Sequence, residues 1–111
     1  SKYIENFKNA LKKEGLKFTN QRFVVFEILF THEGHFDCED IIGLINKSGN
    51  KVSRATVYRT LDILVKYNFA RKLILDDGVA RYENKLFTEH HDHMIDIESN
   101  IFFIFIGTII S

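Results

Sequence analysis

A chain of 111 residues is one domain by length, or one small domain with a fragment, and 45% hydrophobic with 27% charged side chains is ordinary for a globular protein. Its single cysteine excludes a disulfide framework, and residues 1–14 contain no hydrophobic run of a signal peptide. The only continuous apolar run, residues 101–110, is shorter than the roughly 20 residues of a membrane helix. We therefore expect a cytosolic protein with no membrane-spanning part.

Charge is distributed unevenly along the chain. All fifteen lysines and arginines lie in residues 1–85 together with eleven acidic side chains, so this part carries a net charge of +4. Residues 86–111 hold the other four acidic side chains and no basic one, a net charge of −4. A basic segment suits a polyanionic partner, whereas an acidic segment rich in histidine suits cations.

Hydrophobic periodicity and capping residues predict helices over most of the first 68 residues. The second helix has apolar side chains on nearly all sides, so it is predicted to be central. The third has acidic side chains in its first turn, where the helix dipole favours negative charge. The predicted helices and their capping or first residues are 1–14 (Ser1, with Gly15 after the end), 20–30 (Thr19 or Asn20), 37–50 (Asp37) and 53–68 (Ser53).

A hairpin is predicted after the last helix. Two β-rich runs in residues 69–84 are joined by Asp76-Asp77-Gly78, which is typical of a hairpin turn. Helices followed by a basic hairpin are the order of a winged helix, in which the helix before the hairpin enters the major groove of DNA. The predicted fold class is therefore α+β.

The outer side of the fourth helix carries side chains that suit DNA. Arginine can bridge O6 and N7 of guanine, and a tyrosine ring can pack on a thymine methyl group. Ser53 and Thr56, at the helix start, can donate to phosphates. The alternative is that Arg54, Arg59 and Arg71 are solvated charges on an ordinary small domain. The side chains predicted to point outward are Arg54, Ala55, Tyr58, Arg59 and Asp62.

The sequence EHHDH, residues 89–93, contains three of the five histidines. On a strand, Glu89, His91 and His93 would share one face, because successive side chains alternate between faces. His90 and Asp92 would then share the other face. One short segment can therefore contribute to two metal sites back to back. Imidazole and carboxylate groups together suit Fe, Zn, Mn and Co, and these ligand types alone do not determine which metal is bound.

Three motifs, taken together with their order and spacing, resemble the ferric uptake regulator family of bacterial metal-sensing repressors. The resemblance runs from about residue 8 to residue 98 and implies a winged-helix DNA-binding domain, residues 1–85, followed by a small α/β dimerisation domain. The chain ends before the remaining helix and strands of that domain, so residues 86–111 are expected to be its incomplete start. The motifs are GLKFTNQR at 15–22, SRATVYRTLDIL at 53–64 and HHDHMI at 90–95.

The resemblance also implies a cytoplasmic bacterial repressor that binds an AT-rich palindromic operator as a homodimer. Tyr58 and Arg59 match the family's base-reading residues, and Lys17 matches a lysine that enters a narrow AT-rich minor groove, where negative potential is concentrated. The apolar run 101–106 would be an aggregation-prone edge if left open, and it is expected to pair with its equivalent in a second chain. The expected DNA-binding residues are Lys17, Arg22, Ser53, Arg54, Thr56, Tyr58 and Arg59.

Two residues far from the histidine cluster, His35 and Glu83, match ligands of the family's regulatory site. Together with the cluster they would tie the DNA-binding domain to the dimerisation domain. Peroxide-sensing relatives carry aspartate at the position of Glu83, so the resemblance implies a metal-level sensor. Fe²⁺ is the expected regulatory metal, with Zn²⁺ or Mn²⁺ as possible substitutes. The expected regulatory site is His35, Glu83, His91 and His93, and the expected second site, incomplete here, is His90 and Asp92.

The sequence departs from the family pattern near the histidine cluster, and two alternative functions are open. Asp96 and Ser99 stand where many members have a Cys-x-x-Cys that holds a structural zinc, so no four-cysteine zinc site is expected. A zinc uptake regulator, or another metal-specific member of the family, would use the same ligands. A metallohydrolase would need an open coordination position, a general base and a substrate cleft. The sequence offers no nucleophile or phosphate loop, so an enzyme is not expected.

Overall fold

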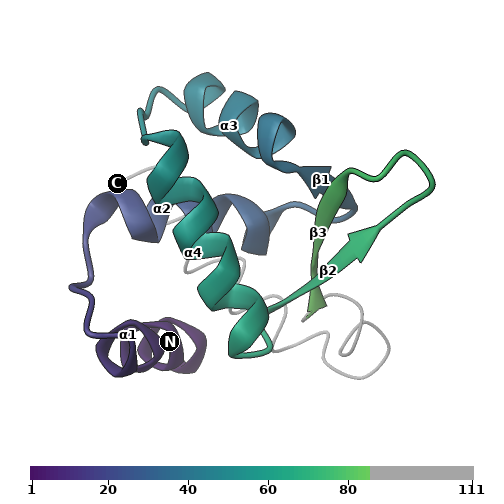
Figure 1. The fold of residues 1–111 in the computed structure, drawn as a ribbon. Coiled ribbons are helices and arrows are strands. Elements are labelled where there is room, and N and C mark those ends of the chain that lie inside the picture. Colours follow the sequence, from purple (N-terminus) through teal and green to yellow (C-terminus); the bar gives the residue numbers. More distant parts are fainter. Residues whose placement is uncertain (86–111) are drawn as a thin grey trace.

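The computed structural model describes residues 1–85 (Figure 1). In Figure 1 α4 passes in front of α2, α1 lies beside one end of α4, and the β2–β3 hairpin extends from the other side. The elements in chain order are α1 (Lys2–Lys13), α2 (Asn20–Thr31), β1 (His35–Asp37), α3 (Cys38–Lys47), α4 (Arg54–Lys66), β2 (Ala70–Ile74) and β3 (Ala80–Asn84).

Side-chain caps determine where the helices begin. Ser1, Thr19 and Ser53 each accept a hydrogen bond from the backbone N–H three residues further along, at 3.2–3.3 Å. At the start of α3, Asp37 and Asp40 form a reciprocal capping box. These bonds satisfy N–H groups that have no partner inside the helix. The predicted caps are confirmed, and for the second helix the cap is the threonine.

The central position predicted for the second helix is confirmed. Every residue of α2 from position 24 to position 30 is buried. The ring of Phe26 stacks on Phe7 of α1 with centroids 4.5 Å apart, and it meets Phe69 edge-on at 5.6 Å. Phe69 lies between α4 and β2, so one aromatic cluster fixes both α1 and the start of the hairpin to α2.

The hairpin belongs to a three-stranded antiparallel sheet with the strand order β1-β3-β2. The predicted hairpin is confirmed, and Gly78 in its loop has a φ of +74°, a conformation that glycine adopts without strain. The sequence does not predict β1, because a strand of three residues (His35–Asp37) is too short to show an alternating pattern. Its pairing with β3 attaches the segment before α3 to the hairpin.

Residues 1–85 therefore form a winged helix, which confirms the predicted α+β class. The hairpin is the wing, and α4 is the helix that precedes it (Figure 1). No helix in these residues is long and apolar enough to cross a membrane. The predicted dimerisation segment, residues 86–111, lies outside the described residues, and so do its expected strand pairing and the departure at Asp96 and Ser99.

A carboxyl group is buried in the middle of α2. Glu27 is 9% exposed, and its Oε2 has no hydrogen-bond partner among residues 1–85. Burial raises the pKa of Glu27 from 4.5 to about 7, because the charged form loses its hydration. The folded protein therefore binds this proton more tightly than the unfolded chain does.

This burial predicts that the protein loses stability as the pH rises from the unfolded pKa of 4.5 through the folded pKa of about 7. Below that window both states are protonated, and above it the folded state carries a buried charge. Glu27→Gln should remove this pH dependence and raise the free energy of unfolding near pH 8 by about 3 kcal/mol. Urea unfolding of the unmodified protein and of Glu27→Gln, at a pH below 4.5 and at a pH above 7, measures this difference in the free energy of unfolding. An unchanged pH slope in Glu27→Gln would show that another group is responsible.

Candidate nucleic-acid interface and metal centre

The exposed face of α4 is the face that the sequence predicts. Val57, Leu61 and Leu64 are buried on the inner side of the helix. On the outer side Tyr58 is 46% exposed, and a hydrogen bond with the Cys38 thiol raises its pKa. Cys38 itself is buried at the start of α3. The predicted outward side chains are all exposed: Arg54, Ala55, Tyr58, Arg59 and Asp62.

The N-terminus of α4 is organised by two hydroxyl groups. Ser53 Oγ accepts a hydrogen bond from the Thr56 N–H and donates one to Thr56 Oγ1 at 2.9 Å. This cap holds the first turn in place, and the first turn of a helix attracts anions through its free N–H groups and its dipole. Both residues thus lie where a phosphate contact is chemically suitable.

Arg54 is held by an acidic residue of a neighbouring helix. Its guanidinium donates to both carboxylate oxygens of Glu39 in α3, and the Nη2–Oε2 distance is 3.3 Å. The hydrogen bond to Glu39 raises the pKa of Arg54. Both side chains are more than half exposed, so the pair is open to exchange with an external anion.

Arg59 has an acidic neighbour that is much less exposed. Its Nη2 lies 3.7 Å from Glu14 Oε1, and the Glu14 side chain is only 14% exposed. Glu14 also accepts hydrogen bonds from Lys66 Nζ and the Tyr67 hydroxyl, both at 2.8 Å. The hydrogen bond from Lys66, followed by that from Tyr67, lowers the pKa of Glu14. Sequence reasoning does not identify Glu14, because 45 to 53 positions separate it from these partners.

Lys17 and Arg22 lie on either side of the start of α2. Lys17 is exposed, and its backbone carbonyl accepts a hydrogen bond from Arg22 Nη1 at 2.6 Å. Arg22 therefore braces the loop that carries Lys17. A contact of either residue with DNA stays a prediction.

The two predicted metal ligands in the described residues are brought together. His35 on β1 and Glu83 on β3 are directly opposite in the sheet, and Glu83 Oε2 accepts a hydrogen bond from His35 Nε2. Glu83 Oε1 accepts from Arg71 Nη2 on β2. Burial opposes ionisation of Glu83, but the hydrogen bonds from Arg71 and His35 outweigh it and lower the pKa of Glu83.

The chemistry of this pair fits a divalent transition metal. An imidazole nitrogen and a carboxylate oxygen already point at one another, and both are ordinary ligands of Fe²⁺, Zn²⁺ and Mn²⁺. Two donors do not complete a site, and in residues 1–85 no group of three or more His, Cys, Asp and Glu side chains could hold a metal ion. The other predicted ligands lie outside the described residues: His90, His91, Asp92 and His93.

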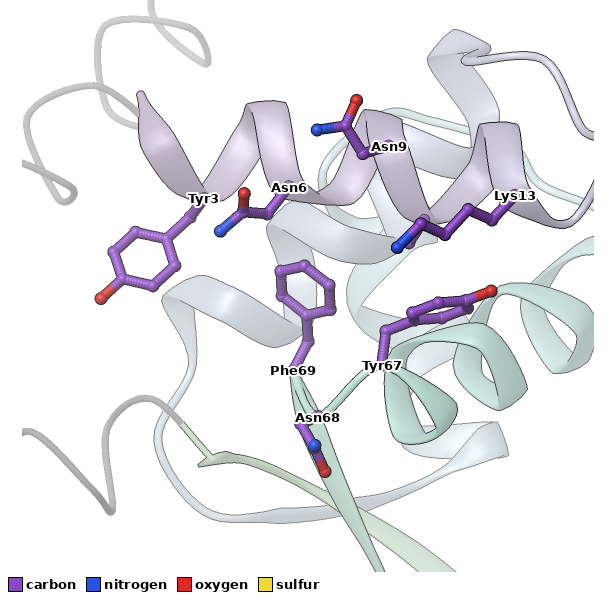
Figure 2. Close-up of a pocket in the computed structure, with 8 residues that line it drawn as sticks. Tyr3, Asn6, Asn9, Lys13, Tyr67, Asn68 and Phe69 are labelled. Atoms are coloured by element: carbon purple, nitrogen blue, oxygen red, sulfur yellow. The ribbon is translucent and has the colours of Figure 1, made fainter.

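A pocket of 330 Å³ lies between α1 and the turn that joins α4 to β2 (Figure 2). Three carboxamides line it, Asn6, Asn9 and Asn68, and Lys13 extends over the ring of Tyr67 at 6.0 Å from the centroid. None of the predicted site residues lines this pocket. It is therefore separate from the predicted DNA and metal sites.

Comparison with known proteins decides the family. The sequence model described as "Ferric uptake regulator family" matches residues 13–109. The chain belongs to the ferric uptake regulator family. A ferric uptake regulation protein from Campylobacter upsaliensis is 38% identical over 96 residues, covering 83% of this chain and 60% of the relative. The chain thus spans about 60% of the length of the curated relatives it matches.

Solved structures of ferric uptake regulator proteins have the same fold. The Helicobacter pylori ferric uptake regulator, described as having three functional metal binding sites, superposes with a TM-score of 0.65 at 33% identity. The match covers 74% of this chain and 55% of that one. FurB of M. tuberculosis, described as a zinc uptake regulator, gives a TM-score of 0.58 at 25% identity over 64% of this chain and 54% of that one. The family therefore includes proteins named for different metals.

Proposed function

We propose that this chain acts as a metal-dependent DNA-binding regulator that represses genes of iron uptake and homeostasis. The observation that carries the proposal is the contact between His35 and Glu83 at the base of the wing, in the same winged helix that exposes the outer face of α4. The proposed metal ligands and the proposed DNA-reading helix therefore belong to the same small domain. Membership of the ferric uptake regulator family supports the same function.

In this proposal α4 lies in the major groove of an AT-rich operator. Arg59 reads a guanine and Tyr58 packs on a base, whereas Arg54, Ser53 and Thr56 contact the backbone. Lys17, on the loop before α2, enters the minor groove beside that site, and Arg22 supports this loop. The protein works as a cytoplasmic homodimer, because a two-fold dimer matches a palindromic operator.

The proposed regulatory site combines His35 and Glu83 with His91 and His93. One ion would then be shared by ligands of the winged helix and of the following segment, which restricts how the two recognition helices of a dimer can be placed. His90 and Asp92 would contribute to a second site. Fe²⁺ is the proposed metal, and a zinc uptake regulator is the alternative, supported by the similarity to a regulator of that name.

The proposal is tested by measuring operator binding of the full chain with and without metal. Fluorescence anisotropy of a labelled AT-rich palindrome should show tight binding with Fe²⁺ under anaerobic conditions, and a chelator should reverse it. Parallel titrations with Zn²⁺ and Mn²⁺ compare the metals, and a scrambled duplex of equal length is the control. Equal binding of the palindrome in the presence and absence of metal would contradict the proposal.

A further inference from the structure

Three side chains form a row across the sheet. Glu83, on the central strand β3, is directly opposite His35 on β1 and Arg71 on β2. Residues that are directly opposite in a sheet lie on the same face and within side-chain reach. The Glu83 carboxylate therefore sits between an imidazole and a guanidinium that belong to different edge strands.

Each oxygen of this carboxylate has a different partner. Oε2 accepts from His35 Nε2, and Oε1 accepts from Arg71 Nη2. The Glu83 side chain is 11% exposed, whereas those of His35 and Arg71 are 48% and 52% exposed. The nearly buried carboxylate is thus held in one orientation, and an ion can reach it from the exposed histidine side.

We propose that Arg71 is a positioning residue of the metal site, an inference that rests on the proposed function. By holding Oε1, the guanidinium turns Oε2 toward His35 Nε2 and makes Glu83 a ligand through a single oxygen. Hydrogen bonds to the ligands of a metal site commonly set ligand orientation and metal affinity in this way. Arg71 lies on a strand of the wing, so the same contact connects the metal site to the wing.

The role of Arg71 predicts how substitutions change metal affinity. Arg71→Met keeps the length of the aliphatic side chain but removes both the charge and the hydrogen bond, so it should weaken binding of Co²⁺ about 10- to 100-fold. Arg71→Lys can donate to one carboxylate oxygen and should recover part of the loss. Lys72→Met removes the same charge from the opposite face of β2, so it should bind Co²⁺ as the unmodified protein does.

The measurement is a titration of the full chain with Co²⁺, followed by the visible absorption of the bound ion. His35→Ala identifies the part of the signal that belongs to this site, which separates it from any second site. The absorption spectrum of the saturated Arg71→Met protein should also shift, because Glu83 is no longer fixed in one orientation. A loss of stability without a change in the ligands would not produce that shift.

The outcomes separate this inference from the proposed function. If His35→Ala binds Co²⁺ like the unmodified protein, the proposed metal site is wrong, and the role of Arg71 is wrong with it. If His35→Ala loses the signal but Arg71→Met binds equally well or more tightly, only the role of Arg71 is overturned. An equal loss in Lys72→Met would also overturn it, since the effect would then be general electrostatics.

Discussion

Replacing His35 with alanine is expected to abolish the proposed metal dependence of operator binding while the protein stays folded. His35 lies on the three-residue edge strand β1, and its side chain is about half exposed, so its removal takes little from the core. Glu83 keeps the hydrogen bond from Arg71 and is not left as an uncompensated buried charge. The change therefore removes a proposed ligand with only a small expected effect on the fold.

The experiment titrates Fe²⁺ anaerobically while the anisotropy of a labelled operator is followed. His32→Ala is a suitable control, because His32 lies on the same connection but its Nδ1 is 2.7 Å from the carbonyl of Ile28. This variant should respond to Fe²⁺ like the unmodified protein. If His35→Ala also kept the full response, His35 would not be a ligand of the regulatory site.

The histidine cluster extends the same test to residues outside the described part of the chain. If residues 89–93 form a strand, His91→Ala should behave like His35→Ala, because both residues are assigned to the regulatory site. His90→Ala should weaken one metal site and have a smaller effect on metal-dependent DNA binding. The opposite result would mean that the two faces of the strand are assigned the wrong way round.

The helices and the hairpin can be predicted from the sequence because their signals are local. A cap such as Ser53 acts on the helix that follows it, and the apolar pattern of α2 is complete within 12 residues. The contact between His35 and Glu83 depends on β1, and a strand of three residues leaves no periodic signal. Resemblance to the family suggested this pair, whereas the antiparallel register supplies its physical cause.

The acidic partners of α4 could not be predicted for a related reason. Glu14 lies in the turn after α1 and Glu39 in α3, and only the packing of these elements against α4 brings the carboxylates to Arg59 and Arg54. The outward direction of the arginines followed from helical periodicity. Their neutralisation by neighbouring carboxylates required the tertiary structure, as did the role of Arg22 in bracing the loop of Lys17.

Replacing Arg59 with alanine is expected to weaken operator binding about ten- to a hundredfold and to relax specificity at one base position in each half-site. Arg59 is on the outer face of α4, and Glu14 lies 3.7 Å from its guanidinium. Because Glu14 also accepts hydrogen bonds from Lys66 and Tyr67, Arg59 is the partner that can leave this cluster for a base. When Arg59 leaves, the Glu14 carboxylate keeps its hydrogen bonds from Lys66 and Tyr67.

Binding to the operator and to duplexes with each half-site position substituted, at several salt concentrations, measures the effect. Arg54→Ala is the matched control, because it removes the same charge from the same helix. If Arg54 contacts phosphate, its loss should weaken binding to all duplexes alike. The slope of the logarithm of the binding constant against the logarithm of the salt concentration should then become shallower by about one. Arg59→Ala should instead lose discrimination at one position: a duplex substituted at the base pair that Arg59 reads should bind this variant nearly as tightly as the original operator. A uniform loss across all duplexes in Arg59→Ala would assign this arginine to the backbone, and base reading would then fall to Tyr58.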